Sequence, residues 1–157
     1  MSRPADNAEW IRNGWKIATR LLAQVEPDAV GCVSTEPALW FDARFVLFYA
    51  LDLSPDRRRE FWIITGEFPP TMVDAGGTVD ERDAVRLFGA LYRRNGGLIK
   101  AGRLGELSLP DFTLGQMKHD PKFGEFLEQI GCYLEEMART FPWERLGING
   151  KVFSQDT

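Results

Sequence analysis

Two apolar segments separated by a polar turn constrain the fold of this chain more than any other feature. Phe45–Leu51 is wholly apolar and rich in aromatic and branched residues, and Phe61–Thr65 has the same character. The intervening Ser54-Pro55-Asp56 is typical of a turn, so the two segments are predicted to pair as an antiparallel hairpin. A continuous apolar run fits a strand that is buried on both faces. The longer stretch 39–51 also carries phenylalanines at helical spacing, so a helix remains open there.

Amphipathic helices are predicted on both sides of this hairpin in the sequence. From Asp6 to Pro27, apolar residues recur at helical spacing, and Gly14 among them favours close packing against a neighbouring element. The segment from Pro121 to Phe141 has the strongest helical periodicity in the chain. The proline at its start is favourable in the first helical turn.

The region between these two helices predicts one further helix and several short elements. Thr78 and Glu81 form a capping box that opens a helix, and Asn95-Gly96 is expected to end it through a left-handed cap. Glu67–Gly77 contains two prolines and is predicted to hold no regular element. Segments that are candidates for short strands are Ala29–Ser34, Gly105–Leu109 and Ile148–Phe153.

Together these elements predict an α+β fold. A small antiparallel sheet of two to four strands is expected to pack with the N-terminal helix and the two later amphipathic helices. The chain has 157 residues and is 44% hydrophobic, which suffices for one core and is short for two domains. We therefore expect residues 1–157 to form a single domain, with flexible ends at 1–6 and 154–157.

Charge and hydropathy exclude several classes of partner. The net charge of −4 gives no basic face for nucleic acid, and Arg57-Arg58-Arg59 is expected to be a solvated turn rather than an anion site. The longest apolar run is far shorter than the ~20 residues that span a membrane. The first nine residues are polar and lack the apolar segment of a signal peptide. We expect a cytoplasmic protein whose partner is another protein or a second copy in a homodimer.

Cysteine and histidine are too few for most metal and nucleophile chemistry. Cys32 and Cys132 lie far apart with no CxxC spacing, and are predicted to be buried, reduced thiols. His119 is the single histidine, so it is expected at a helix entry or on the surface. No metal or cofactor is expected. A solvated face is predicted for the glutamates of the last helix, Glu125, Glu128, Glu135 and Glu136.

Aromatic residues supply the first set of candidate binding residues. Trp40 and Trp62 are two of five tryptophans and fall on the predicted sheet, with Arg44 nearby. A sheet covered by helices on one face only would leave such residues exposed to a partner, while filling the core is the alternative. The leading interpretation is a binding or interaction module without a catalytic constellation, such as a regulatory adaptor or a toxin-neutralising immunity protein.

Acidic residues around the proline-rich loop support a second interpretation. Glu67 follows a predicted strand end at Gly66, where a pocket commonly opens, and Asp74 lies farther along the loop. If the loop folds them together, these carboxylates could perform general acid–base chemistry, with Arg44 as an anion anchor. This predicts a small-molecule-binding domain or weak hydrolase with its pocket at the Gly66–Asp74 loop.

The segment Phe61-Trp62-Ile63-Ile64-Thr65-Gly66-Glu67-Phe68-Pro69 resembles a family of small bacterial proteins known as a domain of unknown function. In that family an aromatic strand runs into a loop of glycine, an acidic residue and proline. Glu81–Phe88 is similar to the helix that follows, and Arg44-Phe45 to an upstream strand entry. The resemblance covers the centre of the chain, and implies a bacterial, cytosolic protein and no particular activity. The chain departs from the family's acidic loop at Glu67, Pro70 and Met72.

Overall fold

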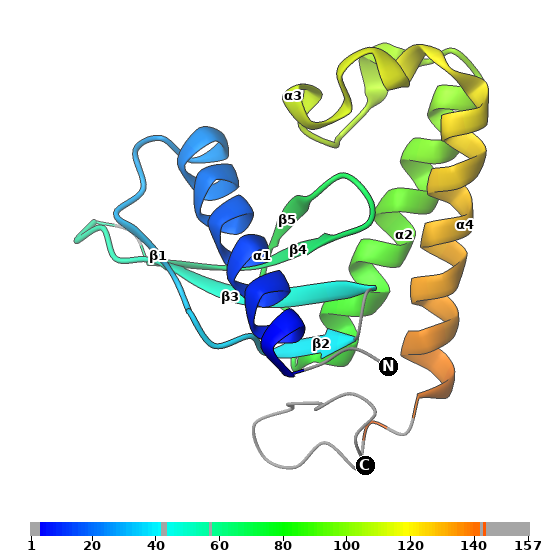
Figure 1. Cartoon of the computed structure of the whole chain (residues 1–157). Helices are drawn as coiled ribbons and strands as arrows, with labels where there is room; N and C mark the ends of the chain where they lie inside the picture. Colours follow the sequence, from blue (N-terminus) through cyan, green and yellow to red (C-terminus); the bar gives the residue numbers. More distant parts are fainter. Residues whose placement is uncertain (1–3, 42–43, 57, 142, 144–157) are drawn as a thin grey trace. The chain divides into compact units, whose positions relative to one another are not determined.

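The computed structural model describes residues 4–41, 44–56, 58–141 and 143, and Figure 1 shows its elements. The chain divides into two compact units. Among these described residues, the first unit comprises those up to Glu81 together with Trp143, and the second comprises those from Arg82 to Phe141. The boundary falls in the first turn of helix α2 (Glu81–Lys100), so the two units are joined within a helix.

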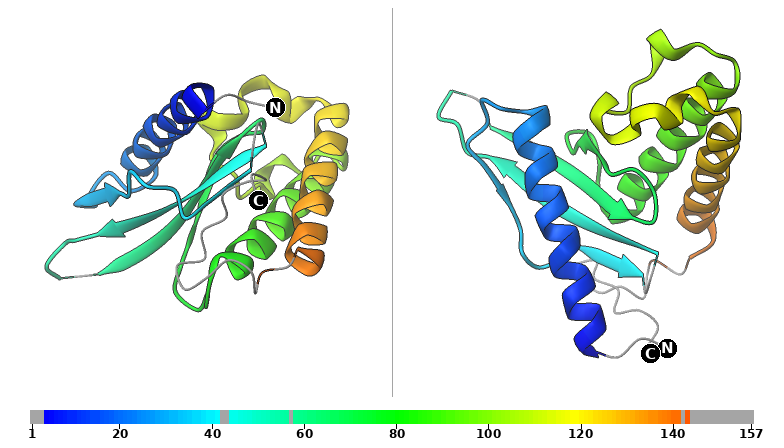
Figure 2. Two further views of the ribbon diagram at one scale, coloured as in Figure 1. Left: turned by 60° about the horizontal axis from the view of Figure 1, so that its bottom comes forward. Right: turned by 45° about the horizontal axis from the view of Figure 1, so that its top comes forward.

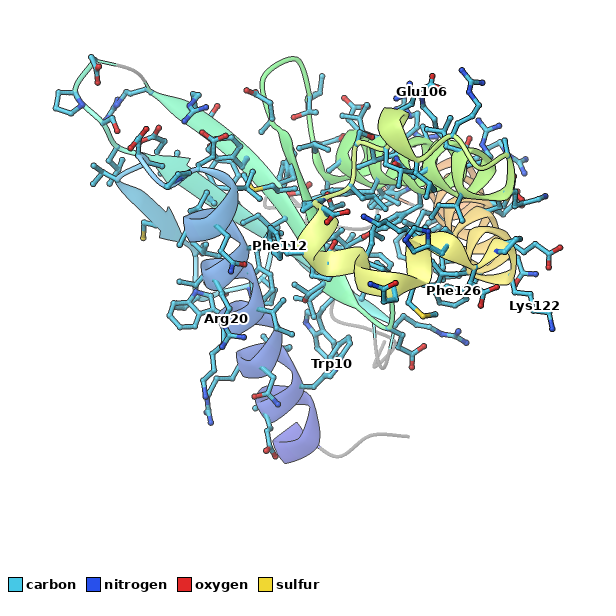
Figure 3. All side chains as sticks on the ribbon, turned by 90° about the horizontal axis from the view of Figure 1, so that it is seen from above. Trp10, Arg20, Glu106, Phe112, Lys122 and Phe126 are labelled. Atoms are coloured by element: carbon cyan, nitrogen blue, oxygen red, sulfur yellow. The ribbon has the colours of Figure 1, made fainter. Side chains whose placement is uncertain are left out.

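Helix α1 (Pro4–Val25) packs along one face of the sheet of the first unit (Figure 1). A Cβ at Gly14 would lie 2.7 Å from Oγ1 of Thr65, so the missing side chain lets the helix approach the sheet closely, as predicted. Figure 3 labels Trp10 and Arg20 on α1. Trp10 packs against the core, whereas Arg20 is exposed, which is the division expected of an amphipathic helix.

Five antiparallel strands form the sheet, in the order β1-β3-β4-β5, with β2 also paired to β3. β3 and β4 pair along their whole length, so the predicted hairpin is confirmed. The stretch 39–51, for which a helix remained open, contains two strands, and the candidate strand at 29–34 is also present. The bounds are β1 (Gly31–Val33), β2 (Leu39–Phe41), β3 (Phe45–Asp52), β4 (Arg59–Gly66) and β5 (Thr71–Asp74).

Both faces of the β3–β4 hairpin are buried. The face toward α1 carries alternate residues of the two strands, since successive side chains of a strand point to opposite faces. The opposite face includes Phe45, Leu47 and Ile64, none of which is exposed. Burial on both faces explains why β3 is continuously apolar rather than alternating. The cluster on the α1 face contains Ala18, Leu21, Leu22, Val33, Val46, Phe48, Ala50, Phe61 and Ile63.

The prediction that Glu67–Gly77 holds no regular element is wrong. Thr71–Asp74 forms β5 and pairs with β4 in antiparallel register. Pro69 and Pro70 come before the first residue of the strand, so they remove no hydrogen bond from its ladder. The Thr-Met-Val sequence that follows them is compatible with a strand, because branched residues fit a pleated, half-buried surface.

The second unit is helical, and α2 runs antiparallel beside α4 (Pro121–Thr140), as Figure 1 and Figure 2 show. The prediction of α4 is confirmed. The backbone N–H of Lys122 donates to Asp120 at 2.9 Å, and Pro121 occupies the first helical position. The elements that connect the two long helices are η1 (Leu104–Glu106), α3 (Asp111–Leu114) and η2 (Gly115–His119).

Helix α2 differs from its prediction at both ends. Thr78 does not cap it, because its hydroxyl donates to the carbonyl oxygen of Ala75 and accepts from Nε1 of Trp62. The predicted cap at Asn95-Gly96 is also wrong, since the helix continues to Lys100. Gly102, just beyond that end, adopts the left-handed conformation with a φ of 72°.

Asn95 explains both the longer helix and the missing strand after it. The residue is fully buried, and its side-chain amide donates to the carbonyl oxygen of Leu91 at 2.8 Å and to Oγ of Ser108 at 2.9 Å. Its side-chain oxygen accepts from the backbone N–H of Ser108 at 2.8 Å. These bonds hold Ser108, the residue before Leu109, against α2. The edge strand predicted at Gly105–Leu109 is therefore wrong.

The predicted α+β fold class, with an N-terminal helix and two later amphipathic helices, is confirmed. The sheet has five strands rather than two to four, because β2 and β5 are short strands beside turns and prolines that resemble loops in sequence. The single domain stays a prediction. Of the ends expected to be flexible, residues 4–6 belong to α1, while 1–3 and 154–157 lie outside the described residues, as does the strand predicted at Ile148–Phe153.

Candidate functional site

The structure places the two predicted tryptophans on opposite faces of the sheet. Trp40 pairs with Val46 and packs against the cluster that α1 covers. Trp62 pairs with Tyr49, which is one residue out of step with the alternate positions that face α1. Their side chains therefore do not share one binding surface.

Arg44 and Glu67 lie together at one end of the hairpin, and Asp74 lies at the other. The backbone N–H of Glu67 donates to the carbonyl oxygen of Arg44 at 3.4 Å. Asp74 pairs with Phe61, whereas Glu67 directly follows Gly66 at the far end of the same strand. At 3.3 Å per residue, the two carboxylates start from backbone positions about 16 Å or more apart along β4. The register thus keeps Glu67 away from Asp74 rather than forming an acid–base pair.

Trp62 is held inside the fold by specific neighbours. Its side chain is buried, and Nε1 donates to Oγ1 of Thr78 at 3.0 Å. The indole makes an edge contact with Tyr49, with 5.3 Å between ring centroids. Burial, together with the hydrogen bond to the Glu60 carboxylate, raises the pKa of Tyr49 to about 12. These contacts give Trp62 a structural role in the sheet.

A cavity of about 630 Å³ lies in the second unit, where residues of α2 and α4 line it. We call it the arginine groove. Four of its eight lining residues are arginines and two are glutamates, so the groove is cationic in a chain whose net charge is −4. The lining residues are Arg82, Arg86, Arg93, Cys132, Glu135, Glu136, Ala138 and Arg139.

Glycines determine how closely the two helices of the groove approach. A Cβ at Gly131 would lie 2.6 Å from the carbonyl oxygen of Gly89, and a Cβ at Gly124 would lie 2.7 Å from that of Gly96. Neither position has room for a side chain. The two glycine pairs are one heptad apart on each helix, so the helix backbones meet along a seam of regular spacing.

Ion pairs cross this seam beside the glycines. Nε and Nη2 of Arg93 donate to the two carboxylate oxygens of Glu135 at 2.6 and 3.3 Å, and this pairing raises the pKa of Arg93. Lys100 binds Glu128 at 2.8 Å one heptad away. The prediction that the α4 glutamates form a solvated face is therefore wrong for Glu128 and Glu135, because both bind side chains of α2.

Two arginines of the groove form exposed pairs within their own helix. Arg86 donates to Asp83 at 2.6 Å, and Arg139 pairs with Glu136. The side chains of Arg86 and Arg139 are 61% and 69% exposed. Exposed pairs of this kind contribute little to stability, so both arginines can exchange their partner for a ligand carboxylate at small cost.

Arg82 is fixed at the end of the groove by the backbone of α4. Its Nε donates to the carbonyl oxygen of Ala138 at 2.7 Å. A guanidinium has five N–H donors, and the bonds named above, all between residues that the structure describes, use one or two on each arginine. The groove is thus suited to binding carboxylates or phosphates, which arginine contacts through paired hydrogen bonds.

Cys132 also lines the groove, and the prediction that both cysteines are buried is wrong. Both cysteines are free but exposed, not buried. Cys32 lies on the short edge strand β1, where only Val33 is buried, and Cys132 lies on α4 next to the buried Gly131 of the seam. On the strand, successive side chains point to opposite faces, so burial of Val33 turns Cys32 outward, whereas on the helix Cys132 lies about 100° around the axis from Gly131.

Sequence reasoning missed the arginine groove because Arg139 is far from the other three arginines along the chain. A signal for the packing was nevertheless present. Glycines recur seven residues apart in both helices, and each is followed four residues later by a charged residue. The two series are Gly89, Arg93, Gly96 and Lys100 in α2, and Gly124, Glu128, Gly131 and Glu135 in α4.

Arg59 is a second residue whose role the sequence did not predict. It belongs to β4 rather than to a solvated turn, and pairs with Glu26 and with Asp52, at 3.1 Å in the latter case. Asp52 is buried and also accepts from the hydroxyl of Ser54 at 2.6 Å and the backbone N–H of Val30 at 3.1 Å. These hydrogen bonds, above all that from Ser54, hold the pKa of Asp52 well below its usual range. The network ties the end of α1 to the hairpin.

The part of the chain that the structure describes offers neither a metal site nor a membrane span. Within it, no group of three or more histidine, cysteine, aspartate or glutamate residues is placed to hold a metal ion. No helix in that part is long and apolar enough to cross a membrane.

A family model described as a domain of unknown function (DUF4826) matches residues 4–104. The match covers well over half of the 157 residues and confirms the resemblance found in the central strand and helix. It includes Arg82, Arg86 and Arg93, whereas α4 lies beyond it. No curated protein and no solved structure matches the chain.

Proposed function

The chain belongs to this family, the domain of unknown function DUF4826, and we propose that it is a binding module whose arginine groove recognises an acidic segment of a partner protein. The observation that supports the proposal is the concentration of arginine around one cavity in an acidic chain. Arginine is the residue best suited to binding carboxylates, since its planar guanidinium donates two parallel hydrogen bonds. The groove has four such groups, of which Arg93 already binds the Glu135 carboxylate through two of its donors.

The lining also favours a protein partner over a denser polyanion. Glu135 and Glu136 lie among the arginines and would repel a ligand with a continuous run of negative charge, such as a nucleic-acid backbone. An acidic polypeptide segment carries separated charges and avoids them. The bacterial and cytoplasmic setting inferred from the sequence, and a role as a regulatory adaptor or immunity protein, belong to this proposal.

Binding of a dye-labelled peptide in which serines separate the glutamates tests the proposal on the full chain. Fluorescence anisotropy at low salt would give the dissociation constant, because screening weakens contacts between exposed charges at higher ionic strength. We expect Arg86→Ala and Arg139→Ala each to weaken binding about fivefold, as expected for one exposed charge pair of about 1 kcal/mol. Both side chains are largely exposed, so both variants are expected to fold.

Arg103→Ala is the matched control. Arg103 is 60% exposed and pairs with Glu106 three residues later, which resembles the pairing of Arg86 with Asp83. It does not line the groove. We expect Arg103→Ala to leave the affinity unchanged. Equal losses in Arg103→Ala and Arg86→Ala would show that the peptide responds to overall charge, and the proposal would be rejected.

A further inference from the structure

The arginines of α2 are spread along the groove rather than gathered at one point. Arg82 and Arg86 are one helical turn apart, which is about 6 Å, and Arg93 is about 10 Å farther along the axis. Arg139 belongs to the Arg82 end, because Arg82 binds the carbonyl oxygen of the preceding Ala138. The cations thus extend over roughly 16 Å of the groove.

This spacing matches an extended polypeptide. In a β-strand, side chains two residues apart point to the same side and are about 7 Å apart. Acidic side chains at alternate positions would therefore reach Arg82 and Arg86 in turn. About five extended residues would span the distance from Arg82 to Arg93.

Other occupants fit the groove less well. A helix docks through an apolar stripe, but only Cys132 and Ala138 among the lining residues are uncharged. A single small anion reaches one end of the groove and leaves the distant arginines without a contact. The occupant must therefore be long, polar and acidic at intervals.

On the basis of the proposed function, we infer that the arginine groove binds its partner as an extended segment with acidic side chains at alternate positions. The acidic side chains alternate with residues that face away from the groove. The exposed pairs of Arg86 with Asp83 and of Arg139 with Glu136 open to receive the ligand carboxylates. Arg82 keeps its bond to Ala138 and contributes its terminal nitrogens.

Two peptides of equal composition and charge test the spacing. The first is dye-labelled Ser-Glu-Ser-Glu-Ser-Glu-Ser, and the second is its isomer Ser-Ser-Glu-Glu-Glu-Ser-Ser. We expect the alternating peptide to bind the full chain at least about threefold more tightly, because all three of its carboxylates share one side at the arginine spacing, whereas only two of the three do so in the isomer. Arg86→Ala is expected to abolish this preference, and Arg103→Ala to retain it.

The outcomes separate this inference from the proposed function. Equal binding of the two isomers, with both weakened by Arg86→Ala, overturns the alternating extended segment and leaves an acidic-ligand groove. Tighter binding of an alanine-rich helical peptide with glutamates four residues apart overturns it in favour of a helical occupant. Failure of every acidic peptide to bind, or binding that Arg86→Ala does not weaken, overturns both.

Discussion

Asp52 makes the stability of the fold depend on pH at the scale of one residue. Its hydrogen bonds hold its folded-state pKa below the unfolded value of about 3.9. A lowered folded-state pKa means that the stabilisation is present above the unfolded pKa and is lost as the pH falls toward the folded one. We predict that the free energy of unfolding falls below about pH 4, and that Asp52→Asn makes this decline shallower. Urea unfolding of both proteins across this range measures the two slopes.

Asp74→Asn provides the comparison for Asp52. Asp74 is exposed and its side chain accepts from the backbone N–H of Gly76 at 2.6 Å. We expect the free energy of unfolding of this variant to decline below about pH 4 as steeply as that of the unmodified protein. If this decline is equally steep in Asp52→Asn, other carboxylates control the loss of stability at low pH, and the role assigned to the network around Arg59 is wrong.

Asn95 shows at the same scale why the sequence misplaced the end of a helix. An Asn-Gly pair commonly ends a helix, and nothing near it in the sequence contradicts that interpretation. In the fold, Asn95 binds Ser108, and a Cβ at Gly96 would lie 2.5 Å from the carbonyl oxygen of Gly124. Both partners come from segments far along the chain. Residue-level signals therefore failed where long-range contacts override local preference.

Elements with strong periodicity could be predicted, and elements defined by their neighbours could not. The hairpin and α4 follow from apolar residues repeated at strand or helix spacing. β5 is four residues long and follows two prolines, so only its pairing with β4 identifies it. The arginine groove depends on the register of α2 against α4, which the glycine spacing indicates only once the two helices are known to pair.

The glycine seam predicts opposite effects for the same substitution at two positions. Gly→Ala stabilises an isolated helix by about 1 kcal/mol. A Cβ at Gly131 would lie 2.5 Å from the backbone nitrogen of Arg93, so we predict that Gly131→Ala lowers the free energy of unfolding by about 2 kcal/mol. Gly97 lies in α2, where the nearest atom to an added Cβ is Oε2 of Glu128 at 3.6 Å. Gly97→Ala is therefore expected to be neutral or stabilising.

Denaturant unfolding of Gly131→Ala and Gly97→Ala measures whether each substitution lowers or raises the free energy of unfolding. Binding of the glutamate–serine peptide by Gly131→Ala adds a functional measurement, since wider helix spacing would displace Arg93 from Glu135. A stabilised Gly131→Ala protein would contradict close contact of α2 and α4 at this position.

At the scale of the whole molecule, the two units share a helix. Their boundary lies at Glu81–Arg82, in the first turn of α2. Helix formation is cooperative, and a helix gains most of its stability from the packing of its buried face. Residues 82–142 alone are near the lower size limit for a self-sufficient core. The single cooperative domain expected from the sequence therefore stays a prediction for a chain that forms two compact units.

The tryptophans allow this expectation to be tested without a new probe. All five are in the first unit, at Trp10, Trp15, Trp40, Trp62 and Trp143, so their fluorescence follows that unit. Far-UV circular dichroism also follows α2 and α4, the long helices of the second unit. We predict that the two signals give the same urea midpoint, because loss of α2 removes the helix that joins the units. A dichroism midpoint at lower urea than the fluorescence midpoint would show that the second unit unfolds first, and the chain would then behave as two domains.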